Sequence, residues 1–199
     1  HNLVELEKDI TIGFEDMART KAIDFSFSTT SDKIECWYDQ RQMQKVVYNL
    51  IANAFKYVNQ QKGMIEVRLD QTDEHAIIRV IDNGIGIASA DIEHIFERFY
   101  QANNDNNSAA TKRGTGIGLA LVKNIVERHH GSINVLSSEG YGSMFVVELP
   151  KSNKLFSKDE IAEVLSQPET KTANNEPTKS KGTAKVLIVE DNNELLDTL

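Results

Sequence analysis

Residues 76–87, AIIRVIDNGIGI, place an acid and two glycines directly after an apolar run. The run predicts a strand packed on a core, and glycine allows tight turns and close approach of a ligand to the backbone. Asp82 at the head of the turn is a poor neighbour for pyrophosphate but a good acceptor for an amino group such as that of adenine. Two other interpretations stay open. One is a plain glycine turn, and the other is a dinucleotide-binding turn, G-x-G-x-x-G, whose third position is Ser89 here.

A second group of polar residues lies on the helix predicted to precede this strand. Asn49, Asn53 and Lys56 are three or four residues apart, so they share one helix face. An amide oxygen suits Mg²⁺, which prefers oxygen ligands, and the lysine suits phosphate. The alternative for this face is an ordinary polar surface in water.

Residues 114–119, GTGIGL, enter another predicted helix. Backbone N–H groups at a helix N-terminus form an anion site, and glycines let phosphate come close to them. The segment is not a P-loop, because no Lys-Ser/Thr pair follows its last glycine.

Three further segments surround these motifs. Phe96 and Phe99 of FERF have the spacing of core residues, and they could also anchor a neighbouring loop. Residues 101–113 carry no large apolar side chain, which predicts a mobile loop. Residues 140–143, GYGS, predict a turn between two strands.

The remaining pattern predicts alternating helices and strands. A helix over 3–20 carries Leu3, Leu6, Ile10 and Met17 on one stripe, and Asp39 with Gln42 can cap the helix that ends near Tyr57. The other expected elements are strands at 22–28, 34–38, 64–70, 75–81, 132–137 and 143–149, a short helix from about Ser89, and a helix over 116–130 that ends at Gly131.

Composition narrows the function classes. The net charge of −8 makes nucleic acid an unsuitable general partner. No apolar run approaches the ~20 residues that span a bilayer. The single cysteine, Cys36, fits a reducing compartment and a place in the core. We expect a cytoplasmic domain, whose parent protein can be anchored in the inner membrane.

The motifs, in this order, resemble the N, first glycine, F, second glycine and third glycine boxes of sensor histidine kinases. These kinases share a superfamily with gyrase, Hsp90 and MutL. The resemblance covers about residues 1–150, with the ATP-binding domain at 21–150. It implies an α/β (α+β) two-layer sandwich of the Bergerat type, in which a mixed sheet packs on helices. ATP and Mg²⁺ are the implied cofactors, with ATP beneath the loop 101–113.

The resemblance also assigns roles by position. Asn53 would ligate Mg²⁺, and Asp82 would accept from the adenine amino group. The other nucleotide-binding residues implied are Lys56, Tyr57, Gly84, Gly86, Arg113 or Lys112 at the γ-phosphate, Gly114, Thr115, Gly116, Gly118 and Leu119.

Asn49 separates the subfamilies, because ATP-hydrolysing relatives carry a glutamate there that activates water. An amide is not a general base at neutral pH. Asn49, Asn53 and Lys56 are therefore expected to serve phosphoryl transfer to a positioned side chain rather than hydrolysis.

The two ends of the chain suggest a longer parent. Residues 1–20 are expected to adjoin a dimerisation hairpin that carries the phosphoacceptor, since none of the five histidines lies in His-Glu-x-Arg-Thr-Pro. Residues 151–183 are polar and predict a linker. Residues 184–199 include KVLIVEDN, which resembles the first strand of a receiver domain, and Glu190 and Asp191 match its Mg²⁺-binding acidic pair.

The leading hypothesis is thus the ATP-binding catalytic domain of a hybrid sensor histidine kinase with a truncated receiver. Its expected partners are the hairpin, the receiver and a second copy in a homodimeric parent. A nucleotide-gated interaction module without kinase activity is an alternative, because the same residues would serve it. A Rossmann-type oxidoreductase is disfavoured by the glycine spacing and the leading acid.

Overall fold

The computed structural model describes residues 1–58, 62–102 and 115–157. Within them a five-stranded sheet has the order β1-β2-β3-β5-β4. The strands are β1 (Asp24–Thr29), β2 (Met64–Gln71), β3 (His75–Asp82), β4 (Ser132–Ser138) and β5 (Gly142–Pro150). β1 pairs parallel with β2 and all other pairs are antiparallel, so the predicted mixed sheet is confirmed.

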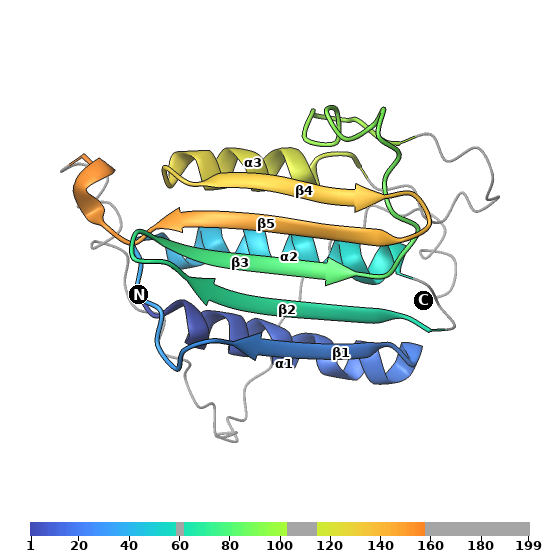
Figure 1. Ribbon diagram of the computed structural model, residues 1–199, viewed down its shortest axis with the longest axis horizontal. Coiled ribbons are helices and arrows are strands. Elements are labelled where there is room, and N and C mark those ends of the chain that lie inside the picture. Colours follow the sequence, from blue (N-terminus) through green and yellow to red (C-terminus); the bar gives the residue numbers. More distant parts are fainter. Residues whose placement is uncertain (59–61, 103–114, 158–199) are drawn as a thin grey trace, which may run out of the picture. The chain divides into compact units, whose positions relative to one another are not determined.

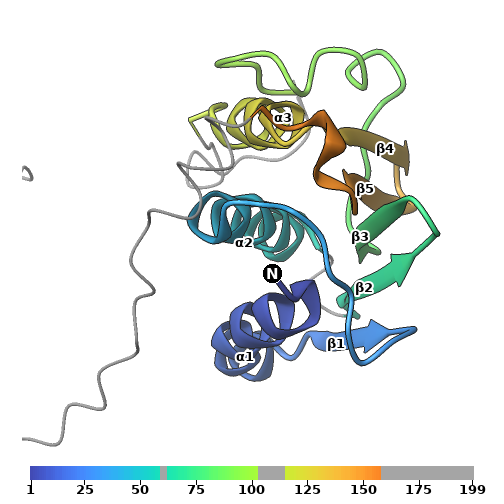
Figure 2. The same ribbon diagram turned by 90° about the vertical axis from the view of Figure 1, so that its left-hand side faces the viewer.

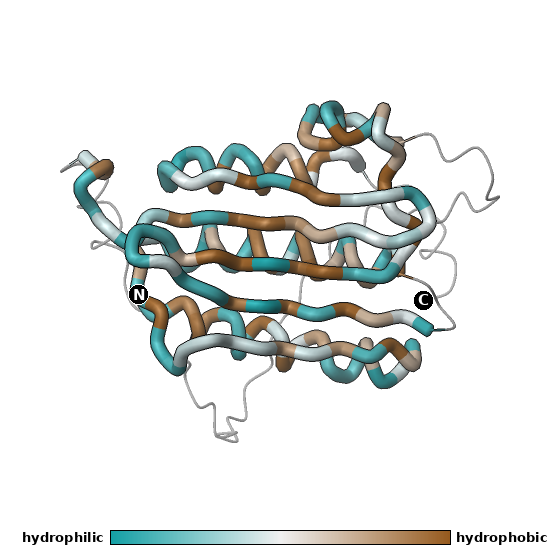
Figure 3. Tube along the Cα trace, in the orientation of Figure 1, coloured by the Kyte–Doolittle hydropathy of each residue, from teal (hydrophilic) through white to brown (hydrophobic). Residues whose placement is uncertain are grey.

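Helices α1 (Leu3–Lys21), α2 (Gln40–Tyr57) and α3 (Gly118–Arg128) cover one face of the sheet (Figures 1 and 2). The strands alternate in hydropathy along their length (Figure 3), because successive side chains point to opposite faces. On β2, for example, Ile65, Val67 and Leu69 are fully buried beneath the helices. The predicted two-layer sandwich is therefore the observed fold.

The start of α2 is fixed by two side chains. Asp39 Oδ1 accepts from Gln42 N at 3.0 Å, which confirms the predicted cap. The backbone N–H of Asp39 donates to His129 Nε2 at 3.0 Å, while His129 Nδ1 lies 2.7 Å from Ile125 O. Since a carbonyl only accepts, His129 is the neutral tautomer with its proton on Nδ1. This buried imidazole joins the end of α3 to the beginning of α2.

The buried face of α1 differs in one place from the predicted stripe. Met17 is 40% exposed, and Phe14 and Ala18 take the inner positions instead. The true face follows the 3.6-residue period from Leu3 through Glu7 to Ala18, whereas a heptad spacing drifts off it. Phe14 stacks on Phe55 of α2 with ring centroids 5.4 Å apart.

Three other local predictions need correction. The expected strand at 34–38 is extended chain with one isolated bridge, Asn2 to Glu35. Its alternating burial is real, but it pairs with residues 1–3 instead of the sheet. The short helix expected from Ser89 is a series of turns. At the end of α3 the left-handed residue is His130, at φ 56°, and not Gly131.

Gly131 has a different reason to be glycine. A Cβ there would lie 2.4 Å from Glu148 O of β5. Cys36 is buried, as expected of a core residue. In the described part of the chain, no helix combines the length and the apolar character that crossing a membrane requires.

Glu7 is fully buried, and neither of its carboxylate oxygens has a hydrogen-bond partner among the described residues. Burial raises the pKa of Glu7 from 4.5 to about 8. The folded protein therefore holds this proton more tightly than the unfolded chain does. Stability is greatest below the unfolded pKa and is lost as the pH rises through about 8.

We predict that Glu7→Leu raises the free energy of unfolding at pH 8 by a few kcal/mol, on the order of 3. It should also flatten the decline in stability between about pH 5 and 8. Urea denaturation across that range measures both effects. Glu15→Gln, an exposed carboxylate on the same helix, is the control and should retain the decline. An unchanged slope in Glu7→Leu would contradict the assignment.

Candidate functional site

Asp82 ends β3, and its side chain points into the space between the sheet and the helices. The residue is only 7% exposed. Its Oδ1 accepts from Gly84 N at 2.8 Å, and the backbone of Ser143 also hydrogen-bonds the carboxylate. Burial raises the pKa of Asp82, and these two backbone bonds act against that rise. Among the described residues no cation is paired with it, so a carboxylate is held here by backbone donors alone.

The turn after Asp82 is clamped between the end of α2 and the β4–β5 turn. Ile85 N donates to Tyr57 O at 3.2 Å on one side, and Ile85 O accepts from Gly140 N at 2.7 Å on the other. A Cβ on Gly84 would lie 2.3 Å from Tyr57 O. Tyr57 was predicted to help hold nucleotide. What its backbone does here is different: the Tyr57 carbonyl positions the turn after Asp82.

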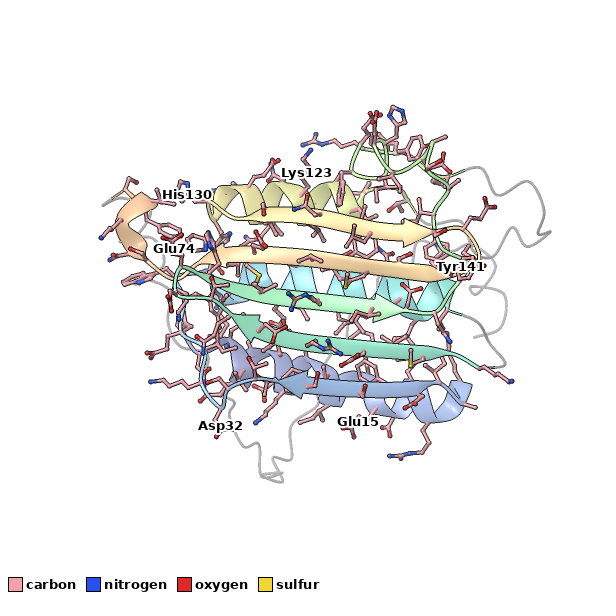
Figure 4. All side chains as sticks on the ribbon, in the orientation of Figure 1. Glu15, Asp32, Glu74, Lys123, His130 and Tyr141 are labelled. Atoms are coloured by element: carbon pink, nitrogen blue, oxygen red, sulfur yellow. The ribbon has the colours of Figure 1, made fainter. Side chains whose placement is uncertain are left out.

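Two more glycines permit backbone contact in this region. A Cβ on Gly86 would lie 2.0 Å from Ser138 O, and one on Gly142 would lie 2.0 Å from Asp82 O. Both glycines have positive φ, 69° and 96°. Figure 4 labels Tyr141 in the β4–β5 turn, at the end of the sheet opposite His130 and Glu74. The first and third glycine motifs therefore form one structure at this end.

Asn49 brings α2 against the start of α3. Its Nδ2 donates to Lys45 O at 2.7 Å, and its Oδ1 lies 2.9 Å from where a Cβ of Gly118 would be. Asn53 and Lys56 follow on the same helix and are half-buried. Lys56 Nζ lies 4.7 Å from the centroid of the Tyr57 ring. The N motif and the end of the second glycine motif are thus neighbours.

Gly116 is tied to the F motif. Its φ is 68°, its carbonyl accepts from Phe99 N at 2.9 Å, and a Cβ would lie 2.7 Å from Phe99 C. Phe99 itself has φ 66° and is 72% exposed, so the core prediction is wrong for it. Phe96 does pack against the core. Gly116 therefore has a structural reason to be glycine in addition to any contact with phosphate.

The remaining predicted site residues divide into two groups. Thr115 is exposed, and Leu119 is half-buried against the core. The others lie outside the described residues: Lys112, Arg113, Gly114, Glu190 and Asp191.

The arrangement fits a nucleotide. The N-cap residue of α3, Ile117, makes no side-chain cap bond, and the first backbone N–H groups of a helix have no acceptor within the helix itself. Such a helix terminus attracts phosphate. Asp82 offers an acceptor for an amino group at the other side.

Ser137 on β4 is a site residue that the sequence analysis missed. Its hydroxyl accepts from Ile87 N at 2.9 Å, donates to Gly142 O at 2.8 Å and lies 3.0 Å from Ser143 Oγ. The sequence did contain a sign of this role. Ile133 and Val135 occupy alternate positions that face the core, and Ser137 is the next position on that face of the strand. A polar residue at a core-facing position favours a specific hydrogen-bonded role.

This fold and this site define an ATP-binding domain of the two-layer class. Residues 38–153 match the family described as histidine kinase-, DNA gyrase B-, and HSP90-like ATPase. The chain belongs to that family.

Individual relatives are sensor kinases. The chain is 40% identical over 148 residues to sensor histidine kinase RppB of Synechocystis sp., a match that covers 74% of this chain and 32% of RppB. It is 32% identical over 212 residues to histidine kinase P4 of Formosa agariphila, covering 98% of this chain and 15% of that protein. The chain thus spans about a third or less of these relatives.

Among solved structures, the catalytic domain of histidine kinase ThkA superimposes with a TM-score of 0.66 at 28% identity, over 75% of this chain and 95% of that one. ThkA has also been solved in complex with the response regulator TrrA, where the TM-score is 0.63 at 25% identity, over 76% of this chain and 41% of that one. The domain is accordingly of the catalytic, ATP-binding type found in sensor histidine kinases.

We predict that Gly84→Ala lowers the free energy of unfolding by about 1–3 kcal/mol, because the new methyl group overlaps a backbone carbonyl that must move. ATP affinity should fall as well, since the turn that holds Asp82 shifts with it. Chemical denaturation and calorimetry measure the two effects. Gly13→Ala is the matched control: nothing lies within 4 Å of its Cβ position, so stability should rise by up to about 1 kcal/mol. Wild-type behaviour of Gly84→Ala would contradict the close contact.

Proposed function

We propose that this domain transfers the γ-phosphoryl group of Mg·ATP to a histidine on a separate helical hairpin domain, within a hybrid sensor histidine kinase. The observation that carries the proposal is Asp82, a buried carboxylate at the centre of glycine turns, which among the described residues is held by backbone donors alone. A buried charge without a partner cation opposes folding, so its presence at this position favours a role in binding.

Different residues bind different parts of the nucleotide. Asp82 accepts from the adenine amino group, and the N–H groups at the start of α3 bind phosphate. Lys56 adds a positive charge for phosphate, and Asn53 supplies an oxygen for Mg²⁺, which neutralises phosphate charge when bound. Asn49 donates its N–H to Lys45 O and offers no base for water, which favours transfer over hydrolysis.

The acceptor domain must dock beside the phosphates. Phe99, Ile117 and Leu121 are 72%, 44% and 38% exposed, and together with Arg98 they line a shallow pocket at the start of α3. Exposed apolar side chains grouped in this way mark interaction surfaces. We therefore place the hairpin at this end of α3, where an imidazole nitrogen can form a bond to the γ-phosphorus as ADP leaves with the bridging oxygen.

The wider assembly follows from the same proposal. Residues 184–199 would begin a receiver domain, with Glu190 and Asp191 as its Mg²⁺-binding acids, and the parent would be a homodimer. The complex of ThkA with its response regulator supports a two-component partner of this kind. We propose a cytoplasmic location for the domain, where ATP is available.

We predict that Asp82→Asn weakens ATP binding about tenfold, because a hydrogen bond to a charged group contributes ~1.5–3 kcal/mol. The free energy of unfolding should not fall. The raised pKa of Asp82 means that its ionisation at neutral pH opposes folding, and an uncharged amide removes that opposition.

Calorimetric titration with Mg·ATP tests the affinity, and denaturation tests stability. Asp24→Asn makes the same charge change at an exposed position on β1 and should bind ATP as the wild type does. An unchanged dissociation constant in Asp82→Asn would refute the adenine assignment.

The chain alone should bind ATP without phosphorylating itself. Phosphoryl transfer depends on positioning an acceptor, and none of the five histidines has the surroundings of a phosphoacceptor. With γ-labelled ATP and Mg²⁺, we expect label on a hairpin domain that carries His-Glu-x-Arg-Thr-Pro and is added in trans, and none on this chain.

Two controls sharpen this experiment. A hairpin whose motif histidine is replaced by glutamine should stay unlabelled, and Asp82→Asn in this chain should slow labelling of the intact hairpin. Acid-labile label on this chain in the absence of the hairpin would show that one of its own histidines is the acceptor. Tight ATP binding with no label on any hairpin would favour the nucleotide-gated interaction module.

A further inference from the structure

Ser137 joins the segments that surround Asp82 through one hydroxyl group. Ile87 N belongs to the end of the turn after β3, and Gly142 O and Ser143 Oγ belong to the start of β5. These segments meet at the end of the sheet where β3 finishes and the β4–β5 turn lies (Figure 1). Ser137 is thus positioned to control how they are oriented relative to one another.

The direction of each hydrogen bond follows from counting protons. A serine hydroxyl has one proton and two acceptor lone pairs. Gly142 O can only accept, so the proton of Ser137 goes there, and Ile87 N–H occupies one lone pair. The bond to Ser143 at 3.0 Å then requires Ser143 to donate. Ser137 therefore turns the proton of Ser143 toward itself.

That orientation matters because Ser143 lies directly opposite Asp82 in the β3–β5 register. Residues opposite each other on one face have Cβ atoms ~4.5–5.5 Å apart, and both side chains are buried. A Ser143 hydroxyl released from Ser137 would be free to donate to the Asp82 carboxylate. It would then compete with the amino group of adenine for that acceptor.

We propose that Ser137 is a positioning residue for nucleotide choice, which keeps Asp82 available for a 6-amino purine by holding the Ser143 hydroxyl away from it. The inference rests on the proposed function, because that function makes Asp82 the adenine acceptor. Ser137 itself touches no nucleotide in this scheme.

The test compares ATP with inosine triphosphate, which has a carbonyl where ATP has the amino group. Dissociation constants of the 199-residue chain for both nucleotides, with Mg²⁺, give a preference ratio. We expect Ser137→Ala to weaken ATP binding roughly three- to tenfold, as loss of a neutral hydrogen bond predicts, and to change inosine triphosphate binding less than about twofold. Ser137→Thr, which keeps the hydroxyl, should restore the ratio.

Ser132→Ala, at the exposed opposite end of β4, is the control and should leave the ratio unchanged. If Ser137→Ala does not fold, the comparison uses Ser137→Cys, whose thiol is a weak donor and acceptor. If the variant keeps the wild-type preference ratio, or loses the same affinity for both nucleotides, the proposed role of Ser137 is wrong. The adenine assignment of Asp82 is not affected by that result. A wild-type chain without preference for ATP overturns both this role and the adenine assignment of Asp82.

Discussion

Backbone-to-backbone contact at the end of β3 is the constraint on which the site depends. The carbonyls of Tyr57, Ser138 and Asp82 each come so close to a glycine that a Cβ there would lie 2.0–2.3 Å away. No other residue type permits these contacts without movement of the chain. Because α2, the turn after β3 and the β4–β5 turn meet in this way, Asp82 is held at a buried position at the end of β3.

The charge of Asp82 and the proton arrangement around it form one electrostatic unit. Two backbone N–H groups stabilise the carboxylate, while burial disfavours its charge. Ser137 and Ser143 direct their hydroxyl protons along a chain that ends on Gly142 O. In the proposed function, Asp82 is the acceptor for the purine and the N–H groups at the start of α3 are the donors for phosphate, a division that suits ATP.

Stability and function are separated in this fold. The hydrophobic core lies between the helices and the inner sheet face, and the aromatic stack of Phe14 on Phe55 joins α1 to α2. Glu7, fully buried on α1, lies in this core and uses no hydrogen-bond partner among the described residues. Burial of the Glu7 carboxyl lowers the free energy of unfolding at neutral pH. Burial of Asp82 also opposes folding, but there a bound ligand can compensate.

The sequence by itself determined the order of most elements and the motifs of the site, because apolar periodicity and glycine spacing are local signals. The two-layer sandwich was predicted from the resemblance of those motifs to sensor histidine kinases. Tertiary structure decided the rest. The alternation at 34–38 is that of a strand, yet its partner is residues 1–3. The glycine at 131 has the position of a helix cap, yet it is required by Glu148 of a distant strand. The alternation of β4 marks Ser137 as a polar residue at an inward position, but only the fold brings Ile87, Gly142 and Ser143 around its hydroxyl. Contacts between residues far apart in the chain leave no periodic trace in the sequence, and only the packed structure reveals them.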